Sequence, residues 1–273
     1  MSRARAPRTR LAVIGTIAAA SVALAGCSSA DGGEEAAGLT LEQVQEAGTL
    51  VVGTEGTYSP FSFHEGGAGE LTGYDVDVIT AVAQELAVEV QFEETQWDAI
   101  FAGLDAGRFD VIANQVGITP DRLERYEFSE PYTYSPGVLI VPEGSDIAGF
   151  DDLDGRTSAQ SLTSNFAQIA TDAGAQVEEV EGFAQAAELL RQGRVDATVN
   201  DRLTFLDYEQ SQGGETGLEI VAETEEVSQS AVAFRAGSES LVAAVDEALA
   251  SLAADGTLSE ISERYFGEDV SQP

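Results

Sequence analysis

Two stretches of this 273-residue chain share one pattern: LDAGRFDVIAN at residues 104–114 and LRQGRVDATVN at residues 190–200. Each begins L-x-x-G-R, continues with an apolar residue and an aspartate, and closes on an asparagine. A glycine in this position commonly ends a helix, and the apolar residues after it predict a buried strand that ends at the asparagine. A fortuitous similarity between two helix–strand turns is the alternative. As an internal repeat, the pattern predicts two similar α/β lobes.

The segments around these stretches alternate between strand and helix periodicity. The first half predicts strands at 49–54, 88–92 and 109–113, with helices at 74–87 and 97–107. The second half predicts strands at 156–160, 176–180 and 195–199, with helices at 166–175, at 183–193 and after residue 201. Amphipathic helices follow at 239–256 and 258–267. This order predicts an α/β fold in which each lobe has a mostly parallel sheet flanked by helices.

Two extended, β-branched segments flank the second series, at residues 139–144 and 227–234. We interpret them as a two-strand hinge between the lobes. The predicted boundaries are residues 46–140 for the first part of lobe 1, 141–228 for lobe 2, and 229–268 for the return to lobe 1 and the C-terminal helices.

The N-terminus has the pattern of an export signal. Residues 1–26 contain four arginines and then an apolar run of about 16 residues, which is shorter than the ~20 of a membrane span. The run ends in LAGC, which resembles the lipobox of bacterial lipoproteins and implies lipidation of Cys27 after cleavage of the signal peptide. A chance cysteine is the alternative. The small, polar and acidic composition after Cys27 predicts that residues 27–45 are a flexible tether, which anchors an extracytoplasmic protein to the cell membrane.

Composition excludes several classes of function. Without the signal peptide the chain has 9 arginines, no lysine and 48 acidic residues, a formal charge of −39 that argues against a nucleic-acid partner. Cys27 is the only cysteine and His64 the only histidine, so a disulfide, a zinc site and a Ser-His or Cys-His nucleophile are not expected. Neither a P-loop nor a GxGxxG turn follows a strand. We therefore expect neither a metal nor a cofactor.

The ends of the repeated stretches mark a binding edge. Ligands of open α/β sheets bind beyond the carboxyl ends of the strands, where Asn114 and Asn200 lie, and two such edges facing each other form a cleft. Close by, Thr119 suits a helix N-cap, but Arg122 places a cation at the positive end of that helix. The macrodipole disfavours this by a few tenths to about 1 kcal/mol, which suggests that Arg122 binds an anion.

The chain resembles a known family in three long motifs, LVVGTEGTYSPFSF, WDAIFAGLDAGRFDVIANQVGITPDRLERYEFSEPY and YTYSPGVLIV. These are similar to family 3 of the bacterial extracellular solute-binding proteins, over about residues 48–268. The resemblance implies a two-lobed, type II periplasmic-binding-protein-like fold. It also implies a monomer that delivers polar amino acids to the permease and ATPase subunits of an ABC importer. EGTYSPFSF, NQVGIT-x-x-R and VNDRL look most similar to the cystine-binding branch.

The resemblance also implies roles for individual residues in lobe 1. Arg122 lies where the family arginine binds the ligand α-carboxylate, which suits its planar fork. Tyr58 and Trp97 match aromatic positions that enclose the ligand side chain, although either could be a core residue. Glu55 matches an acidic position that meets a distal cation, with a solvated loop acid as the alternative. The loop residues that would complete the carboxylate site are Asn114, Gln115, Gly117 and Thr119.

In lobe 2 the resemblance implies two further contacts. Asp201 lies where the family aspartate pairs with the ligand α-ammonium, and a helix N-cap is a compatible role. Thr163, Ser164 and Asn165 align with a loop that offers amides at a helix N-terminus, a favourable place for an anion. Here the sequence departs from the usual Gly-Thr pattern, which leaves the individual roles open.

The resulting hypothesis is a lipid-anchored receptor, not an enzyme, that closes on a polar amino acid. Cystine is the first candidate, and glutamine, glutamate or a basic amino acid are alternatives. Some cyclohexadienyl dehydratases resemble these receptors, so a dehydratase with Glu55 or Asp201 as its acid is a second hypothesis. A sensor domain is the third, and because the chain stops at GEDVSQP it would need a separate partner.

Overall fold

The structure is a computed structural model that describes residues 36–273. The predicted signal peptide (1–26), the lipidated Cys27 and the tether up to residue 35 lie outside the described residues, so these stay predictions.

The first lobe is built mainly from the N-terminal half of the described chain. Its elements are α1 (Leu41–Ala47), β1 (Thr49–Thr54), β2 (Thr57–Tyr58), β3 (Ser62–His64), the 3-10 turn η1 (Glu65–Gly67), β4 (Leu71–Thr72), α2 (Tyr74–Glu85), β5 (Glu89–Glu94), α3 (Trp97–Asp105), β6 (Val111–Gly117), α4 (Pro120–Leu123) and β7 (Tyr126–Phe128).

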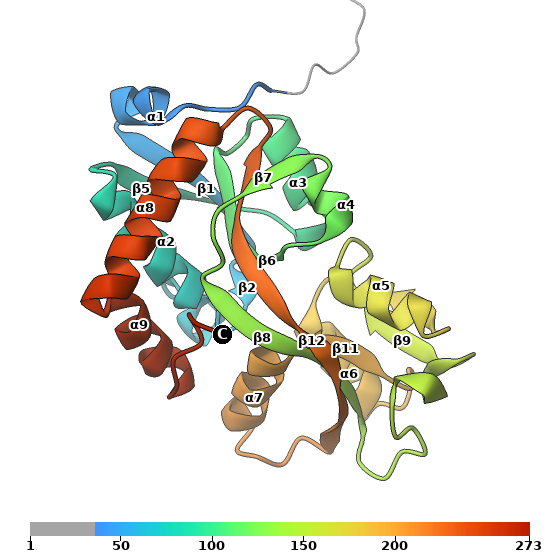
Figure 1. The fold of residues 1–273 in the computed structure, drawn as a ribbon. Coiled ribbons are helices and arrows are strands. Elements are labelled where there is room, and N and C mark those ends of the chain that lie inside the picture. Colours follow the sequence, from blue (N-terminus) through green and yellow to red (C-terminus); the bar gives the residue numbers. More distant parts are fainter. Residues whose placement is uncertain (1–35) are drawn as a thin grey trace, which may run out of the picture. The chain divides into compact units, whose positions relative to one another are not determined.

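Two long strands, β8 (Thr133–Pro142) and β12 (Leu218–Arg235), carry the chain into the second lobe and back. Between them lie the elements of that lobe: η2 (Phe150–Leu153), β9 (Thr157–Gln160), α5 (Asn165–Asp172), β10 (Gln176–Glu179), α6 (Phe183–Arg191), β11 (Thr198–Asp201) and α7 (Arg202–Ser211). The chain then returns to the first lobe as α8 (Glu239–Asp255) and α9 (Thr257–Phe266). Figure 1 shows β8 and β12 passing side by side between the two groups of helices.

One seven-stranded sheet continues through both lobes in the order β11–β8–β12–β6–β1–β5, and β7 pairs with β12. β1 is parallel to β5 and β6, whereas β12 is antiparallel to both β6 and β8. β9 and β10 form a parallel pair, joined to the second lobe's end of this sheet by a bridge between Ser158 and Ala197. The predicted α/β fold is confirmed, with parallel pairs in each lobe. Antiparallel pairs involve the crossing strands, and a small separate sheet, β2–β3–β4, is antiparallel as well.

The ladder between β8 and β12 is irregular. It runs from Thr133 opposite Ser230 to Pro142 opposite Leu218, with register shifts between Ile220 and Ala222 and between Glu223 and Val227. Leu139 and Ile140 pair with β11 as well. Residues 139–142, which we expected in the hinge, therefore form part of the second lobe's sheet. The exact lobe boundaries stay predictions.

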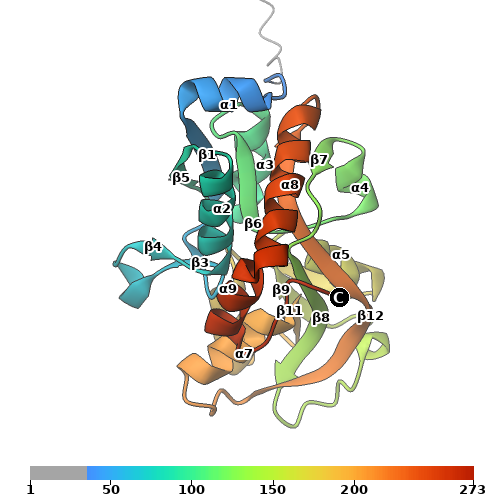
Figure 2. The same cartoon turned by 60° about the vertical axis from the view of Figure 1, so that its left-hand side comes forward.

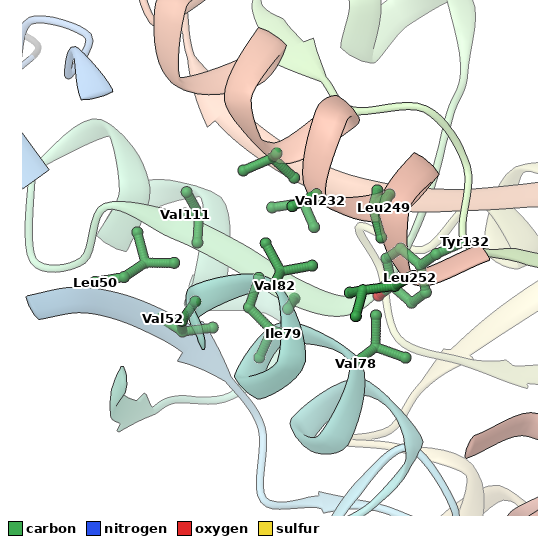
Figure 3. Close-up of a cluster of buried hydrophobic side chains, with 14 of the residues drawn as sticks. Leu50, Val52, Val78, Ile79, Val82, Val111, Tyr132, Val232, Leu249 and Leu252 are labelled. Carbon is green, nitrogen blue, oxygen red and sulfur yellow. The ribbon is translucent and has the colours of Figure 1, made fainter. Parts of the chain in front are cut away.

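The first lobe's core forms because α2 presents one apolar face to the sheet. Val78, Ile79 and Val82 are buried there, as the helical spacing predicts, against Val52 and Val111 of the strands. Figure 3 shows these side chains converging, with Leu249 and Leu252 of α8 closing the same layer. α2 and α8 lie next to each other in both ribbon views (Figure 2). Every residue of β6 is buried, as expected for a strand covered on both faces.

Two details differ from the sequence expectations. Residues 41–45, assigned to the flexible tether, belong to α1, where Thr40 and Gln43 form a capping box and Val44 is buried, so the tether prediction is wrong there. β6 continues from Asn114 to Gly117 instead of ending at the asparagine, because β12 supplies backbone partners there. None of the helices within residues 36–273 is both long and apolar enough to cross a membrane.

Candidate ligand-binding site

A cavity lies between the two lobes, and seven of the predicted residues line it. They are Glu55, Tyr58, Trp97, Asn114, Gln115, Ser164 and Asn165. The other lining residues were not among the predicted contacts: Thr57, Ser161, Gly182, Phe166, Phe183 and Asn200. Asn200 lies at the binding edge that the repeat predicts for its lobe. Phe166 and Phe183 stand at the starts of helices, where the apolar pattern alone indicates core.

Asn114 positions the carboxyl group of Glu55. Its Oδ1 accepts hydrogen bonds from Thr54 Oγ1 and from the Glu55 amide, both at 2.9 Å, and its Nδ2 donates to Glu55 Oε2 at 2.7 Å. Burial raises the pKa of Glu55 to about 7, against the lowering effect of the Asn114 bond. The cavity therefore holds a carboxyl group that titrates near neutral pH.

Gln115 is held in an unusual conformation by a buried aspartate. Its φ of 50° lies in the left-handed region, and its amide and Nε2 donate to the two oxygens of Asp75 at 2.7 and 2.6 Å. Burial raises the pKa of Asp75 to about 7. Sequence reasoning missed Asp75, although it lies three and four residues before Val78 and Ile79. A charged residue on that apolar helical face was the available signal.

Tyr58 connects the lobes across the cavity. Its hydroxyl donates to Asn200 Oδ1 at 3.1 Å and accepts from Thr204 Oγ1 at 3.0 Å. Burial raises the pKa of Tyr58 well above its usual value, so the hydroxyl stays protonated. Trp97 packs edge-on against Phe101, and its buried Nε1 has no hydrogen-bond partner among the described residues. Both aromatic residues therefore line the cavity, and their contact with a ligand side chain stays a prediction.

Arg122 borders the cavity without lining it. Its Nη1 donates to the Gly117 carbonyl at 2.8 Å, its Nη2 to the Thr163 carbonyl at 3.0 Å, and its guanidinium lies 5.4 Å from the Trp97 ring centre. None of the ion pairs within residues 36–273 includes it. Burial lowers the pKa of Arg122 to about 10, so it keeps its charge at neutral pH. The predicted N-cap is present, because Thr119 Oγ1 accepts from the Arg122 amide at 3.3 Å.

The remaining predicted residues separate into two places. Gly117, Thr119, Arg122 and Thr163 lie on a wider groove that shares Ser164 and Asn165 with the cavity. Asp201 is 4% exposed and lies outside the cavity wall.

Asp201 is the N-cap of α7. Its Oδ1 accepts hydrogen bonds from the Leu203 amide at 2.7 Å and from Ser135 Oγ at 2.8 Å. Burial raises the pKa of Asp201 to about 6. The N-cap role proposed from the sequence is confirmed, and pairing with an ammonium group stays a prediction.

The described residues hold no group of three or more His, Cys, Asp or Glu side chains that could bind a metal ion. His64 lies away from the cavity on the β3–β4 hairpin, with its ring nitrogens 2.8 Å from the Gly69 carbonyl and 2.9 Å from Glu94 Oε2. The groups that the cavity and the groove do present are charged, amide and aromatic side chains, which suit a small polar molecule.

Comparisons with known proteins place these features in context. The sequence model of one protein family, the bacterial extracellular solute-binding proteins, family 3, matches residues 50–268 of this chain. The L-cystine-binding protein TcyA of Bacillus subtilis is 51% identical over 230 residues, which cover 84% of this chain and 85% of that protein.

Two solved structures are similar to different degrees. The L-cystine solute receptor of Neisseria gonorrhoeae, in its unliganded open conformation, is 46% identical and covers 85% of this chain and 99% of its own, with a TM-score of 0.58. An ancestral arginine-binding protein bound to arginine is 36% identical over 81% of this chain and 99% of its own, with a TM-score of 0.75. The relative that is more similar in sequence is thus less similar in structure.

Proposed function

Because this chain belongs to the bacterial extracellular solute-binding proteins of family 3, we propose that it is the substrate-binding component of an ABC importer and that its ligand is L-cystine. One observation carries the proposal: Arg122, with no ion-pair partner among the described residues, borders an interlobe cavity that contains Glu55. A fixed cation and a carboxyl group on one cleft suit a zwitterion.

Each end of a zwitterion has a partner of suitable chemistry. The guanidinium of Arg122 provides a planar fork for a carboxylate, and such charge-assisted pairs are stronger than neutral hydrogen bonds. Cystine carries an α-ammonium and an α-carboxylate at each of its two ends, and Glu55 would pair with the α-ammonium of one end. Asp201 would pair with the other ammonium after a small rearrangement of its α7 cap. The aromatic faces of Tyr58 and Trp97 would enclose the disulfide between these ends.

Closure of the lobes would complete the site. Tyr58 of the first lobe bonds Asn200 and Thr204 of the second, so the cavity wall is continuous only when the lobes are together. The lower TM-score with the open receptor than with the arginine-bound protein supports a closed arrangement here. A ligand that contacts both lobes favours that arrangement by its differential affinity for it.

The remaining parts of the proposal concern the setting of the protein. We propose lipid anchoring through Cys27, an extracytoplasmic location, delivery to permease and ATPase subunits, and a monomeric receptor without enzymatic activity. The family is extracellular, and the relative from Bacillus subtilis is named as a binding protein, which supports this assignment over a dehydratase.

A thermal-shift screen of cystine and the standard amino acids, followed by calorimetry, tests the ligand assignment. A ligand at a hundredfold excess over its Kd adds about 2.7 kcal/mol to the free energy of unfolding. We expect that shift with cystine and a smaller one, or none, with glutamine, glutamate and arginine. A larger shift with any of these three would overturn the cystine assignment, and no shift with any amino acid would overturn the receptor function.

A further inference from the structure

Asp98 of the first lobe accepts three hydrogen bonds from the second lobe. It is the second residue of α3, directly after Trp97. Its Oδ1 accepts from the Thr163 amide at 2.9 Å and from Thr163 Oγ1 at 2.7 Å, and its Oδ2 accepts from the Leu162 amide at 3.3 Å. The carboxylate also lies in the first turn of its helix, where the macrodipole favours a negative charge.

The first lobe holds Thr163 on two sides. Asp98 binds its amide and hydroxyl, and Arg122 Nη2 binds its carbonyl at 3.0 Å. Residues 161–164 form the turn between β9 and α5, closed by a hydrogen bond from the Ser164 amide to the Ser161 carbonyl. Because this turn also carries Ser161 and Ser164 of the cavity wall, fixing it fixes one side of the binding site.

Asp98 is not itself part of the cavity wall. Its three bonds join the lobes, so they exist only while the lobes are in contact and break when they separate. We propose that Asp98 is a positioning residue that holds the closed arrangement and thereby slows ligand release, without touching the ligand. The kinetic part of this proposal rests on the proposed receptor function, whereas the closure itself does not.

Two other hydrogen bonds between the lobes are useful for comparison with those of Asp98. Ser59 Oγ donates to Asp207 Oδ2 at 2.9 Å, and Gln96 Nε2 donates to Glu181. Each is one hydrogen bond between side chains. Asp98 instead binds two backbone amides, which cannot turn away as side chains do, so its loss should affect closure more than the loss of either of these two bonds.

Asp98 also affects the ionisation of Glu55, and this effect would disfavour ligand binding rather than support it. Its negative charge contributes to the raised pKa of Glu55, after burial. Removing Asp98 would leave Glu55 more fully ionised and a better partner for an ammonium group. The change at Glu55 therefore opposes any loss of ligand affinity in the variant.

Stopped-flow fluorescence tests the kinetic prediction, since Trp97 is the only tryptophan and lines the cavity. With cystine as ligand, we expect Asp98→Ala to raise the dissociation rate constant about tenfold, equivalent to about 1.4 kcal/mol, and to leave the association rate constant within twofold. Asp98→Asn keeps one acceptor oxygen and should give a smaller increase. Glu239→Ala removes an exposed carboxylate from the first turn of α8 and is the matched control.

Small-angle X-ray scattering without ligand separates this proposal from the receptor function. Asp98→Ala should increase the radius of gyration relative to wild type, and Glu239→Ala should leave it unchanged. Equal radii together with dissociation rate constants within twofold of wild type would overturn the proposal. If cystine and the other amino acids fail to bind wild type, the receptor function fails, and the radii alone decide whether Asp98 holds the lobes together.

Discussion

Replacing Glu55 by glutamine should make the protein more stable at alkaline pH and weaken ligand binding. Burial raises the pKa of Glu55 from 4.5 to about 7. Between these two values the folded state binds a proton that the unfolded state has lost, so stability falls as pH rises from 4.5 to 7 and is constant above. At 1.36 kcal/mol per pKa unit, the ionised carboxylate costs the folded state at most about 3 kcal/mol above pH 7.

Glu55→Gln removes this cost while its Oε1 can still accept the Asn114 hydrogen bond. We therefore expect its free energy of unfolding at pH 8, from urea titration, to exceed that of wild type by up to about 3 kcal/mol, and the gain to vanish near pH 4.5. Asp75 and Asp201 titrate in the same range, so the difference between variant and wild type, rather than either curve, isolates Glu55. Glu46→Gln, on the exposed face of α1, is the control.

Binding should change in the opposite sense. In the proposed complex a ligand ammonium pairs with ionised Glu55, so in wild type cystine binding below pH 7 should release a proton and weaken as pH falls, by up to tenfold per pH unit. Calorimetry in buffers of different ionisation enthalpy measures this release, which Glu55→Gln should abolish. Equal stability of variant and wild type at pH 8 would refute the assigned burial of the carboxylate. Unchanged proton release would refute its contact with the ligand.

Three further predictions concern the site and its support. Arg122→Ala should weaken cystine binding more than a hundredfold in calorimetry, because the proposed charge pair with the ligand carboxylate loses one partner, with an unchanged circular dichroism spectrum; a Kd within tenfold of wild type would contradict this proposed role. Asp75→Ala should leave two donors of Gln115 unsatisfied and lower the free energy of unfolding by about 1–3 kcal/mol at pH 5.5. The loss should be smaller at pH 8, where wild type carries the cost of ionised Asp75, and urea titrations showing the reverse order would contradict its raised pKa. Ile79→Ala should cost about 2–5 kcal/mol in the same assay, since the side chain is fully buried against the sheet, and a loss below 1 kcal/mol would contradict its place in the core.

The sequence predicted what depends on local pattern. Helical spacing located the buried face of α2, and Thr119 as an N-cap located the start of α4. The repeat placed Asn114 and Asn200 at the facing edges of the lobes, and both line the cavity. These features could be found because periodicity and capping involve residues close together in the chain.

Contacts that join distant residues were not predictable in the same way. Asp98 is 65 residues from Thr163, and Asp75 is 40 residues from Gln115, so no local pattern links either pair. The capping role of Asp201 was predictable from the helix that follows it, but its bond to Ser135 was not. The placement of Arg122 on the groove rather than on the cavity wall likewise depends on how the lobes meet.

The irregular ladder between β8 and β12 has a mechanical consequence. The chain passes between the lobes in these two strands, so rotation of one lobe against the other must twist a two-stranded ribbon. Regular pairing resists twisting, and the register shift between Glu223 and Val227 interrupts it. We therefore expect the torsional compliance of the molecule to be concentrated in a few residues of β12, which line the wider groove but not the cavity. Substitutions there would alter the elastic energy of opening, and with it the ligand affinity, while every binding group stays in place.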